Sequence, residues 1–113
     1  AHQGDNMATS VPAAQVKKIA FACEAGMGSS LIGANQLKKK IKDAGLQVQV
    51  MHCPVHQIPK DAQVVVSHAG LAKRARSTAP WAVVIAFQSF VGNPVYDQLA
   101  KSLAAGQDIV EAG

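Results

Sequence analysis

The chain has 113 residues, two cysteines and a net charge of +4, which fits one domain of ordinary size. Hydrophobic residues make up 49% of it, against 16% charged and 4% aromatic, which favours a core of small aliphatic side chains and excludes a disordered chain. The longest apolar run, Trp81 to Phe87, is far shorter than the roughly 20 residues that a membrane-spanning helix needs, so no span is expected.

Residues 1–15 lack the basic start and continuous apolar stretch of a secretory signal. We interpret them as a linker, a tail or an artificial remnant, followed by one domain over residues 16–113. Without an export signal a reducing, cytoplasmic location is expected, in which Cys23 and Cys53 are free thiols.

The eleven Lys and Arg residues fall in clusters, and we interpret them as solvated helix faces in preference to a binding surface, so no nucleic-acid partner is expected. The clusters are Lys17-Lys18, Lys38-Lys39-Lys40 with Lys42, and Lys73-Arg74 with Arg76.

A strand, a glycine-rich loop and a helix are predicted, in that order, at the start of the domain. The apolar run Ile19–Ala22 is typical of a buried strand, and it ends at Cys23. Glycines and serines follow in residues 24–30, after which apolar residues recur at helical spacing. The pattern predicts a helix from about Ser29 to Ala44, ended by Gly45, with its lysines opposite the apolar stripe.

The rest of the domain alternates between strands and helices, which predicts an α/β fold with a parallel sheet covered by helices on both faces. The alternation of Leu46, Val48 and Val50 with glutamines is typical of a strand with one covered face, and Pro54 and Pro59 indicate a loop after it. Further strands are predicted at Ala62–Val66 and Trp81–Phe87, and helices at Leu71–Ser77 and around Val95, Leu99 and Leu103.

Three metal-ligand types, His52, Cys53 and His56, lie close together in the sequence. A structural zinc site normally has four ligands, so we interpret the three as loop residues and expect Cys53 to be inert. We place Trp81 in the core and expect Met27 to be exposed on a docking surface.

Cys23 lies where a nucleophile would be useful, because ligands of open parallel sheets bind beyond the carboxyl ends of the strands. The start of the next helix offers unpaired N–H groups and a positive dipole end, which favour a thiolate and bind phosphoryl oxygens. Gly26 and Gly28 permit a tight bend, and Ser29 and Ser30 can add hydroxyl donors. An inert buried cysteine is the alternative, but it leaves the Gly-Ser loop unexplained.

The loop matches neither the dinucleotide-binding pattern nor the Walker pattern, which disfavours nucleotide binding. In cysteine phosphatases five residues separate the cysteine from an arginine, and here Ser29 holds the position of that arginine. Without the guanidinium, and with Glu24 the only acid evident near the loop, the site is expected to pass a phosphoryl group to a second acceptor and not to hydrolyse it.

The segment from Cys23 to Ser30, with Gly33-Ala34 and Leu37–Ile41, resembles the phosphocysteine loop and first helix of mannitol-type enzyme IIB domains of the bacterial sugar phosphotransferase system. The resemblance covers about residues 16–104 and includes Asp43-Ala44-Gly45-Leu46, Val64-Val65-Val66, Ser67-His68, Leu71 and Arg74-Ala75.

That resemblance implies a four-stranded parallel sheet with helices on both sides, similar to the low-molecular-weight tyrosine phosphatases. It implies a sugar phosphotransferase in which Cys23 takes a phosphoryl group from a phosphohistidine of a IIA domain and passes it to a sugar, mannitol or a related hexitol, held by a membrane IIC domain. No metal, nucleotide or other cofactor is implied, and the domain would work at the inner face of the membrane. The implied phosphoryl cradle is Glu24, Ala25, Gly26, Met27, Gly28, Ser29 and Ser30.

The chain departs from the usual family pattern at Glu24, where Asp is common, and at Ala69-Gly70, where charged residues usually follow the histidine. His68 itself is expected either to support the Cys23 loop or to be a helix-cap or surface histidine. Two other functions remain open: a cysteine phosphatase, and a non-catalytic regulatory module built on the same fold.

Overall fold

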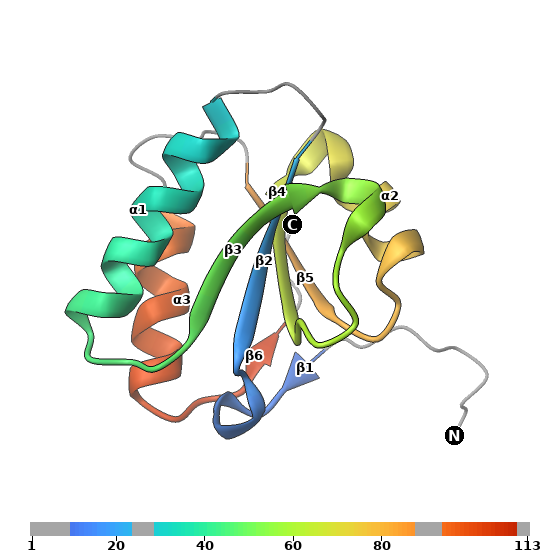
Figure 1. Cartoon of the computed structure of the whole chain (residues 1–113). Coiled ribbons are helices and arrows are strands. Elements are labelled where there is room, and N and C mark those ends of the chain that lie inside the picture. The colour runs from blue at the N-terminus through green and yellow to red at the C-terminus, as the bar shows by residue number, and fades with distance from the viewer. Residues whose placement is uncertain (1–9, 24–28, 88–93, 111–113) are drawn as a thin grey trace, which may run out of the picture.

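Four parallel strands form the central sheet of the domain (Figure 1). They are β2 (Lys18–Cys23), β3 (Gln49–Pro54), β4 (Val64–His68) and β5 (Val83–Phe87), in the spatial order β3-β2-β4-β5. The structure, a computed structural model, describes residues 10–23, 29–87 and 94–110. Strands β2, β4 and β5 consist largely of β-branched and small residues, and nearly all of their residues are buried on both faces, as in parallel sheets that are covered by helices.

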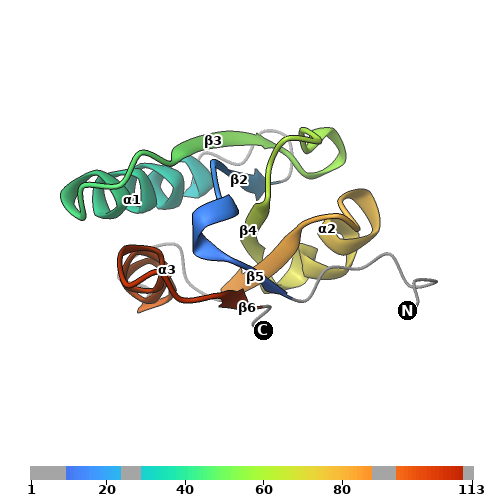
Figure 2. The same ribbon diagram turned by 90° about the horizontal axis from the view of Figure 1, so that it is seen from below.

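Helices cover both faces of this sheet, which confirms the predicted α/β fold (Figure 2). Helices α1 (Ser29–Asp43) and α3 (Pro94–Ala104) pack on one face, and the short helix α2 (Ala72–Thr78) packs on the other. The Lys40 ammonium lies 2.9 Å from the Asp97 carboxylate and joins α1 to α3 at the surface.

The two faces differ in the size of their side chains. Under α1 and α3 the core is bulky and includes Phe21, Leu37 and Tyr96, all fully buried. Under α2 it consists largely of alanines, among them Ala20 and Ala75. Small side chains let the backbone of α2 approach the sheet closely, and Val55 and Ile58 add to the cover of that face.

Strand β3 begins at Gln49, so its predicted start at Leu46 is wrong. Gly45 adopts a left-handed conformation (φ 74°) and caps α1: its N–H donates to the Lys42 carbonyl (2.9 Å), and the Leu46 N–H donates to the Ile41 carbonyl (3.2 Å). This is the Schellman arrangement, in which the residue after the glycine packs back on the helix. Leu46 is therefore apolar because of the helix cap and not because of a strand.

Two strands also end later in the chain than the sequence predicted. Strand β3 continues through Pro54, so His52 and Cys53 are strand residues and the prediction that they lie in a loop is wrong. Strand β4 likewise includes Ser67 and His68. These corrections place His52 and Cys53 of β3, and Ser67 and His68 of β4, on the two strands beside the end of β2.

Trp81 lies outside the core, contrary to the prediction, and is 37% exposed. Its indole Nε1 donates a hydrogen bond to the carbonyl oxygen of Ala62 (3.0 Å), just before β4 begins. An indole N–H usually needs an acceptor, and here the acceptor lies at the rim of the sheet, so the ring stays partly open to solvent.

A small antiparallel pair lies at the amino-terminal end of the sheet. Strand β1 (Ser10–Val11) pairs with β6 (Ile109–Val110), and a 3₁₀ turn η1 (Ala13–Gln15) follows β1. Two further 3₁₀ turns are η2 (Val55–Gln57) and η3 (Ala69–Leu71). Residues 10–15 thus lie against the domain, whose predicted boundary at residue 16 stays a prediction. None of the helices in the described ranges is long and apolar enough to cross a membrane.

Candidate active site

Cys23 is the last residue of β2, one of the two inner strands, and lies at the carboxyl edge of the sheet between β3 and β4 (Figure 1). Its side chain is 4% exposed, and it is a free thiol. The chain re-enters the described part at Ser29, which begins α1. Cys23 therefore occupies the strand-to-helix junction at which it was expected.

Most of the expected phosphoryl cradle falls outside the described residues, namely Glu24, Ala25, Gly26, Met27 and Gly28. Ser29 and Ser30 form the first turn of α1, as predicted. The role of this loop stays a prediction, and so does the exposure of Met27.

His52 contacts Cys23: the Sγ atom lies 3.0 Å from the imidazole Nε2. The parallel register pairs Phe21 with His52 and Cys23 with Pro54, so His52 lies two residues before the partner of Cys23 on the neighbouring strand and on the same face. Side chains at positions 21, 23 and 52 point to the α1 side of the sheet. The thiol also lies 3.5 Å from the carbonyl oxygen of Cys53, to which it can donate.

Sequence analysis missed the contact between Cys23 and His52. The signal that would have found it is the alternation that ends at Val50, because position 52 continues the same covered face of the strand. The loop predicted after this strand hid that continuity.

Cys53 lies on the opposite face of the sheet, in the alanine-rich core under α2. Burial, with a smaller contribution from the nearby Cys23, raises the pKa of its thiol from 9.0 to about 11. A thiol that stays protonated at neutral pH is a poor nucleophile, which fits the expectation that Cys53 is inert.

His68 caps the 3₁₀ turn η3: its Nδ1 accepts a hydrogen bond from the Gly70 N–H (3.1 Å). Its ring also meets the Phe87 ring edge-on, with centroids 5.9 Å apart. This confirms the helix-cap expectation. A Cβ at position 70 would lie 3.3 Å from Nδ1, so the glycine keeps the cap uncrowded.

The cap leaves the second expectation for His68 open. Since Ala22 pairs with Ser67, His68 lies beside Cys23 on the next strand and on the same face. Support of the loop by His68 stays a prediction.

Ser67 is fully buried, and its hydroxyl has no hydrogen-bond partner among the described residues. The register places it between Ala22 of β2 and Ala86 of β5, on the α2 face. No sequence pattern indicated this.

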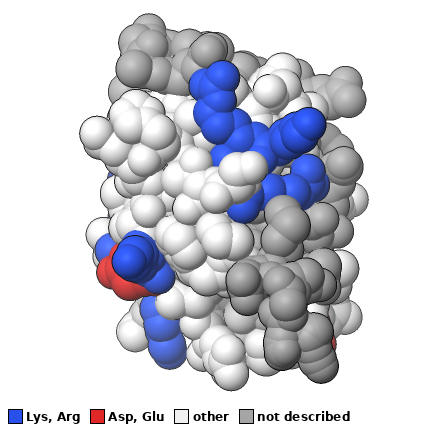
Figure 3. Space-filling model, turned by 90° about the vertical axis from the view of Figure 1, so that its right-hand side faces the viewer, with Lys and Arg blue, Asp and Glu red and all other residues white. Residues whose placement is uncertain are grey.

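Basic side chains gather on the α2 side of the molecule (Figure 3). Lys73 and Arg74 of α2 are exposed and Arg76 is partly exposed, so the predicted solvated helix face is confirmed there. Lys38, Lys39, Lys40 and Lys42 are likewise exposed on α1. The α2 group follows η3, which starts at the carboxyl end of β4, the same edge of the sheet as Cys23.

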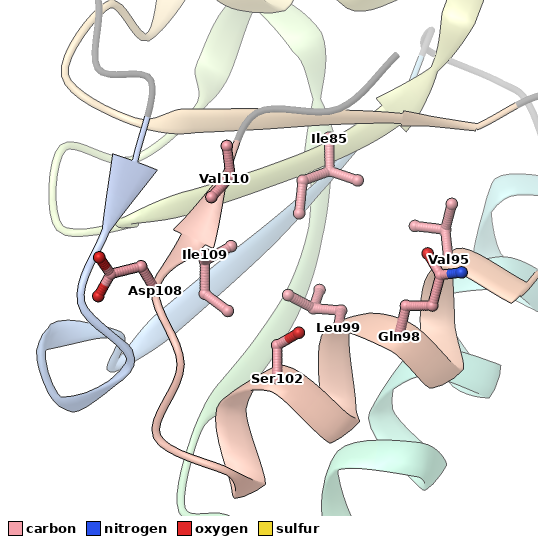
Figure 4. A pocket seen from close by; sticks show the side chains of 8 residues that line it. All are labelled: Ile85, Val95, Gln98, Leu99, Ser102, Asp108, Ile109 and Val110. Atoms are coloured by element: carbon pink, nitrogen blue, oxygen red, sulfur yellow. The ribbon is translucent and has the colours of Figure 1, made fainter.

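A shallow hollow of about 200 Å³ lies between α3 and β6, away from Cys23 (Figure 4). Its wall is largely apolar, and none of the candidate site residues predicted from the sequence lines it. The lining residues are Ile85, Val95, Gln98, Leu99, Ser102, Asp108, Ile109 and Val110.

Comparison with known proteins gives a consistent picture. The family described as "PTS system, Lactose/Cellobiose specific IIB subunit" matches residues 18–102. The chain is 44% identical over 90 residues to the "PTS system mannitol-specific EIICB component" of Geobacillus stearothermophilus, which covers 80% of this chain and 19% of that protein.

Two further relatives agree with it. The mannitol-specific EIICBA component of Pasteurella multocida is 43% identical over 89 residues, covering 79% of this chain and 14% of the relative. The mannitol-specific cryptic EIICB component of Escherichia coli K12 is 38% identical over 91 residues, covering 80% and 20%. The chain thus spans a fifth or less of the length of these relatives.

Proposed function

Because the chain belongs to the phosphotransferase-system family of lactose/cellobiose-specific IIB subunits, we propose that it is a phosphocarrier domain whose phosphorylated residue is Cys23. The observation that carries the proposal is the position of this thiol, at the end of an inner strand and separated from α1 only by residues 24–28. In open parallel sheets this is the place where ligands bind. In this proposal residues 16–113 are the IIB domain.

The reaction has two steps. The Cys23 sulfur attacks the phosphorus of a phosphohistidine on a IIA domain, so that a P–S bond forms and the P–N bond breaks. A hydroxyl oxygen of the sugar then attacks the same phosphorus, the P–S bond breaks, and the thiol is restored. No metal, nucleotide or other cofactor takes part.

Residues Glu24 to Ser30 would hold the phosphoryl oxygens through backbone N–H groups, helped by the hydroxyls of Ser29 and Ser30. The first turn of α1 supports this assignment, because a helix start has unpaired N–H groups and a positive dipole end. No acidic side chain lies in that first turn to repel an anion.

The acceptor sugar we propose is mannitol or a related hexitol. The support comes from the names of the relatives, which are mannitol-specific although the family description names lactose and cellobiose. Those relatives are EIICB or EIICBA components, so we propose a membrane IIC domain as the partner that holds the sugar and a IIA domain as the phosphoryl donor. The domain then works at the inner face of the cell membrane.

Phosphorylation of the chain by a reconstituted phosphoenolpyruvate relay, ending in a mannitol-type IIA domain, tests the proposal. Intact mass should show one phosphoryl group, resistant to hydroxylamine as a thiophosphate ester is. Cys23→Ser should acquire none, whereas Cys53→Ser, the matched control, should be labelled like the wild type. An unlabelled wild type, or a labelled Cys23→Ser, would contradict the proposal.

The same preparation tests the two other functions. Release of phosphate from an aryl phosphate would indicate a phosphatase, which Ser29 at the arginine position disfavours. A folded protein that takes up no phosphoryl group from any IIA donor would indicate a regulatory module.

A further inference from the structure

The thiol of Cys23 is buried, but its imidazole partner is not. Cys23 is 4% exposed, whereas His52 is exposed, and the two side chains are in contact, with 3.0 Å between Sγ and Nε2. A buried thiol that must become a thiolate needs a group that takes its proton. The imidazole lies between the sulfur and solvent and meets that need.

We propose that His52 is a catalytic residue that accepts the proton of the Cys23 thiol and so generates the thiolate that attacks the donor. This rests on the proposed phosphocarrier function and adds an acid–base group to it. A paired imidazole is one of the common ways in which a cysteine nucleophile is activated.

The protons balance over both steps. In the first step the proton moves from Sγ of Cys23 to Nε2 of His52, and the thiolate attacks phosphorus. The electron pair of the broken P–N bond returns to the donor imidazole, which takes up one proton. In the second step the sugar hydroxyl loses its proton as the O–P bond forms, and sulfur leaves as a thiolate. One proton then returns to the sulfur through His52.

Other groups around the sulfur are less suited to this role. The carbonyl oxygen of Cys53, 3.5 Å from Sγ, can accept a hydrogen bond but cannot carry the proton away. His68 of β4 is on the same face, but its Nδ1 is engaged by the Gly70 N–H. The Cys53 side chain lies on the opposite face, and the first turn of α1 carries no acidic residue.

His52→Asn tests the role, since an amide can still hydrogen-bond the sulfur but cannot carry its proton at neutral pH. The first measurement is the rate of iodoacetamide alkylation at Cys23 from pH 5 to 10, followed by mass of the Cys23 peptide in the unphosphorylated chain. At pH 7 the variant should react about tenfold more slowly, with its profile displaced to higher pH, because an unpaired thiol is only a few per cent thiolate there.

His56→Asn and His68→Asn are the matched controls. His56 is an exposed histidine of η2, and His68 is the other histidine on the Cys23 face. His56→Asn should keep the wild-type alkylation profile, and His68→Asn should change it by less than His52→Asn does. Identical profiles for wild type and His52→Asn, or a larger change in His68→Asn, would overturn the proposal.

The second measurement separates this proposal from the phosphocarrier function. With the IIA donor, His52→Asn should still be phosphorylated on Cys23, but about tenfold or more slowly at pH 7, within the range of general-base effects. If the wild type is not phosphorylated at all, the phosphocarrier function fails, whereas the alkylation profiles still decide the role of His52. Equal phosphorylation rates for wild type and His52→Asn count against the role.

Discussion

Gly33 of α1 lies so close to Tyr96 of α3 that the Cβ of an alanine at position 33 would be 2.5 Å from the tyrosine hydroxyl oxygen. The same Cβ would be 2.7 Å from Cζ of Phe21, in β2. Phe21 and Tyr96 are fully buried and pack on each other, with ring centroids 6.1 Å apart, so neither ring can move away easily. Gly33 therefore sets how closely α1 approaches the strand that ends at Cys23.

Gly33→Ala should lower the free energy of unfolding by about 1–3 kcal/mol, the usual cost of an added carbon in a tightly packed site. Since α1 would move outward, phosphorylation of Cys23 should also slow. Asn35→Ala, on the exposed side of the same helix, is the control and should leave both unchanged or slightly raise stability. Urea unfolding measures the first effect; a Gly33→Ala protein as stable as the wild type would mean that the contact relaxes freely.

Ser67→Ala should raise the free energy of unfolding by about 1 kcal/mol, because it removes a fully buried hydroxyl that has no partner in the described part of the chain. Ser67→Thr keeps the hydroxyl and adds a methyl group beside Ala22 and Ala86, so it should lower stability. Thermal unfolding of the two variants gives the comparison. Destabilisation by Ser67→Ala would show that the hydroxyl is hydrogen-bonded after all.

Charge reversal on α2 should slow phosphorylation by a IIA donor if the basic group of Figure 3 helps to bind an acidic partner. The double variant Lys73→Glu/Arg74→Glu should lose about tenfold in rate at low salt, and the difference from wild type should shrink at high salt. Lys38→Glu/Lys39→Glu makes the same charge change on exposed positions of α1 and is the matched control. If both double variants slow equally, the net charge matters and the α2 surface does not.

Stability should fall at alkaline pH because of two buried groups. Burial raises the pKa of Tyr96 from 10.0 to about 12, and that of Cys53 from 9.0 to about 11, the latter also through Cys23. Both groups stay protonated up to a higher pH in the folded chain than in the unfolded chain. Their contribution to stability is therefore fully present below the pKa values of the unfolded chain. It is lost between pH 9 and 11 for Cys53 and between pH 10 and 12 for Tyr96.

Urea unfolding at pH 8, 9.5 and 11 measures this loss. Tyr96→Phe removes one of the two ionising groups, so its stability should fall less steeply above pH 10 than that of the wild type. Parallel curves for the two proteins would contradict the assignment to Tyr96.

The sequence alone was sufficient for the architecture because the strands under the helices are nearly continuous apolar runs. The runs around Phe21 and Val65 can hardly be anything but buried strands, and the lysine-rich stretch before Gly45 fits an exposed helix face. The start of the edge strand β3 was predicted too early because Leu46 belongs to the cap of α1. The residue after a helix cap can be as apolar as a strand residue.

The chemistry was only partly predictable for a related reason. The position of Cys23 between a strand and a helix was predicted from its local context, and its role stays a proposal. His52 is distant from it in the sequence and reaches it only through the register of β2 and β3. Register depends on how whole strands pair, and an error of a few residues at the start of a strand conceals such a contact.

The chain contains a single tryptophan, and its hydrogen bond to Ala62 fixes it at the amino-terminal rim of the sheet, the edge opposite Cys23. Intrinsic fluorescence from Trp81 will therefore report unfolding of the sheet at that rim, and the indole lies far from the thiol. Its emission can therefore follow unfolding of the free and the phosphorylated forms and allow a direct comparison, because phosphorylation at the opposite edge should not itself change the signal. No added label is needed.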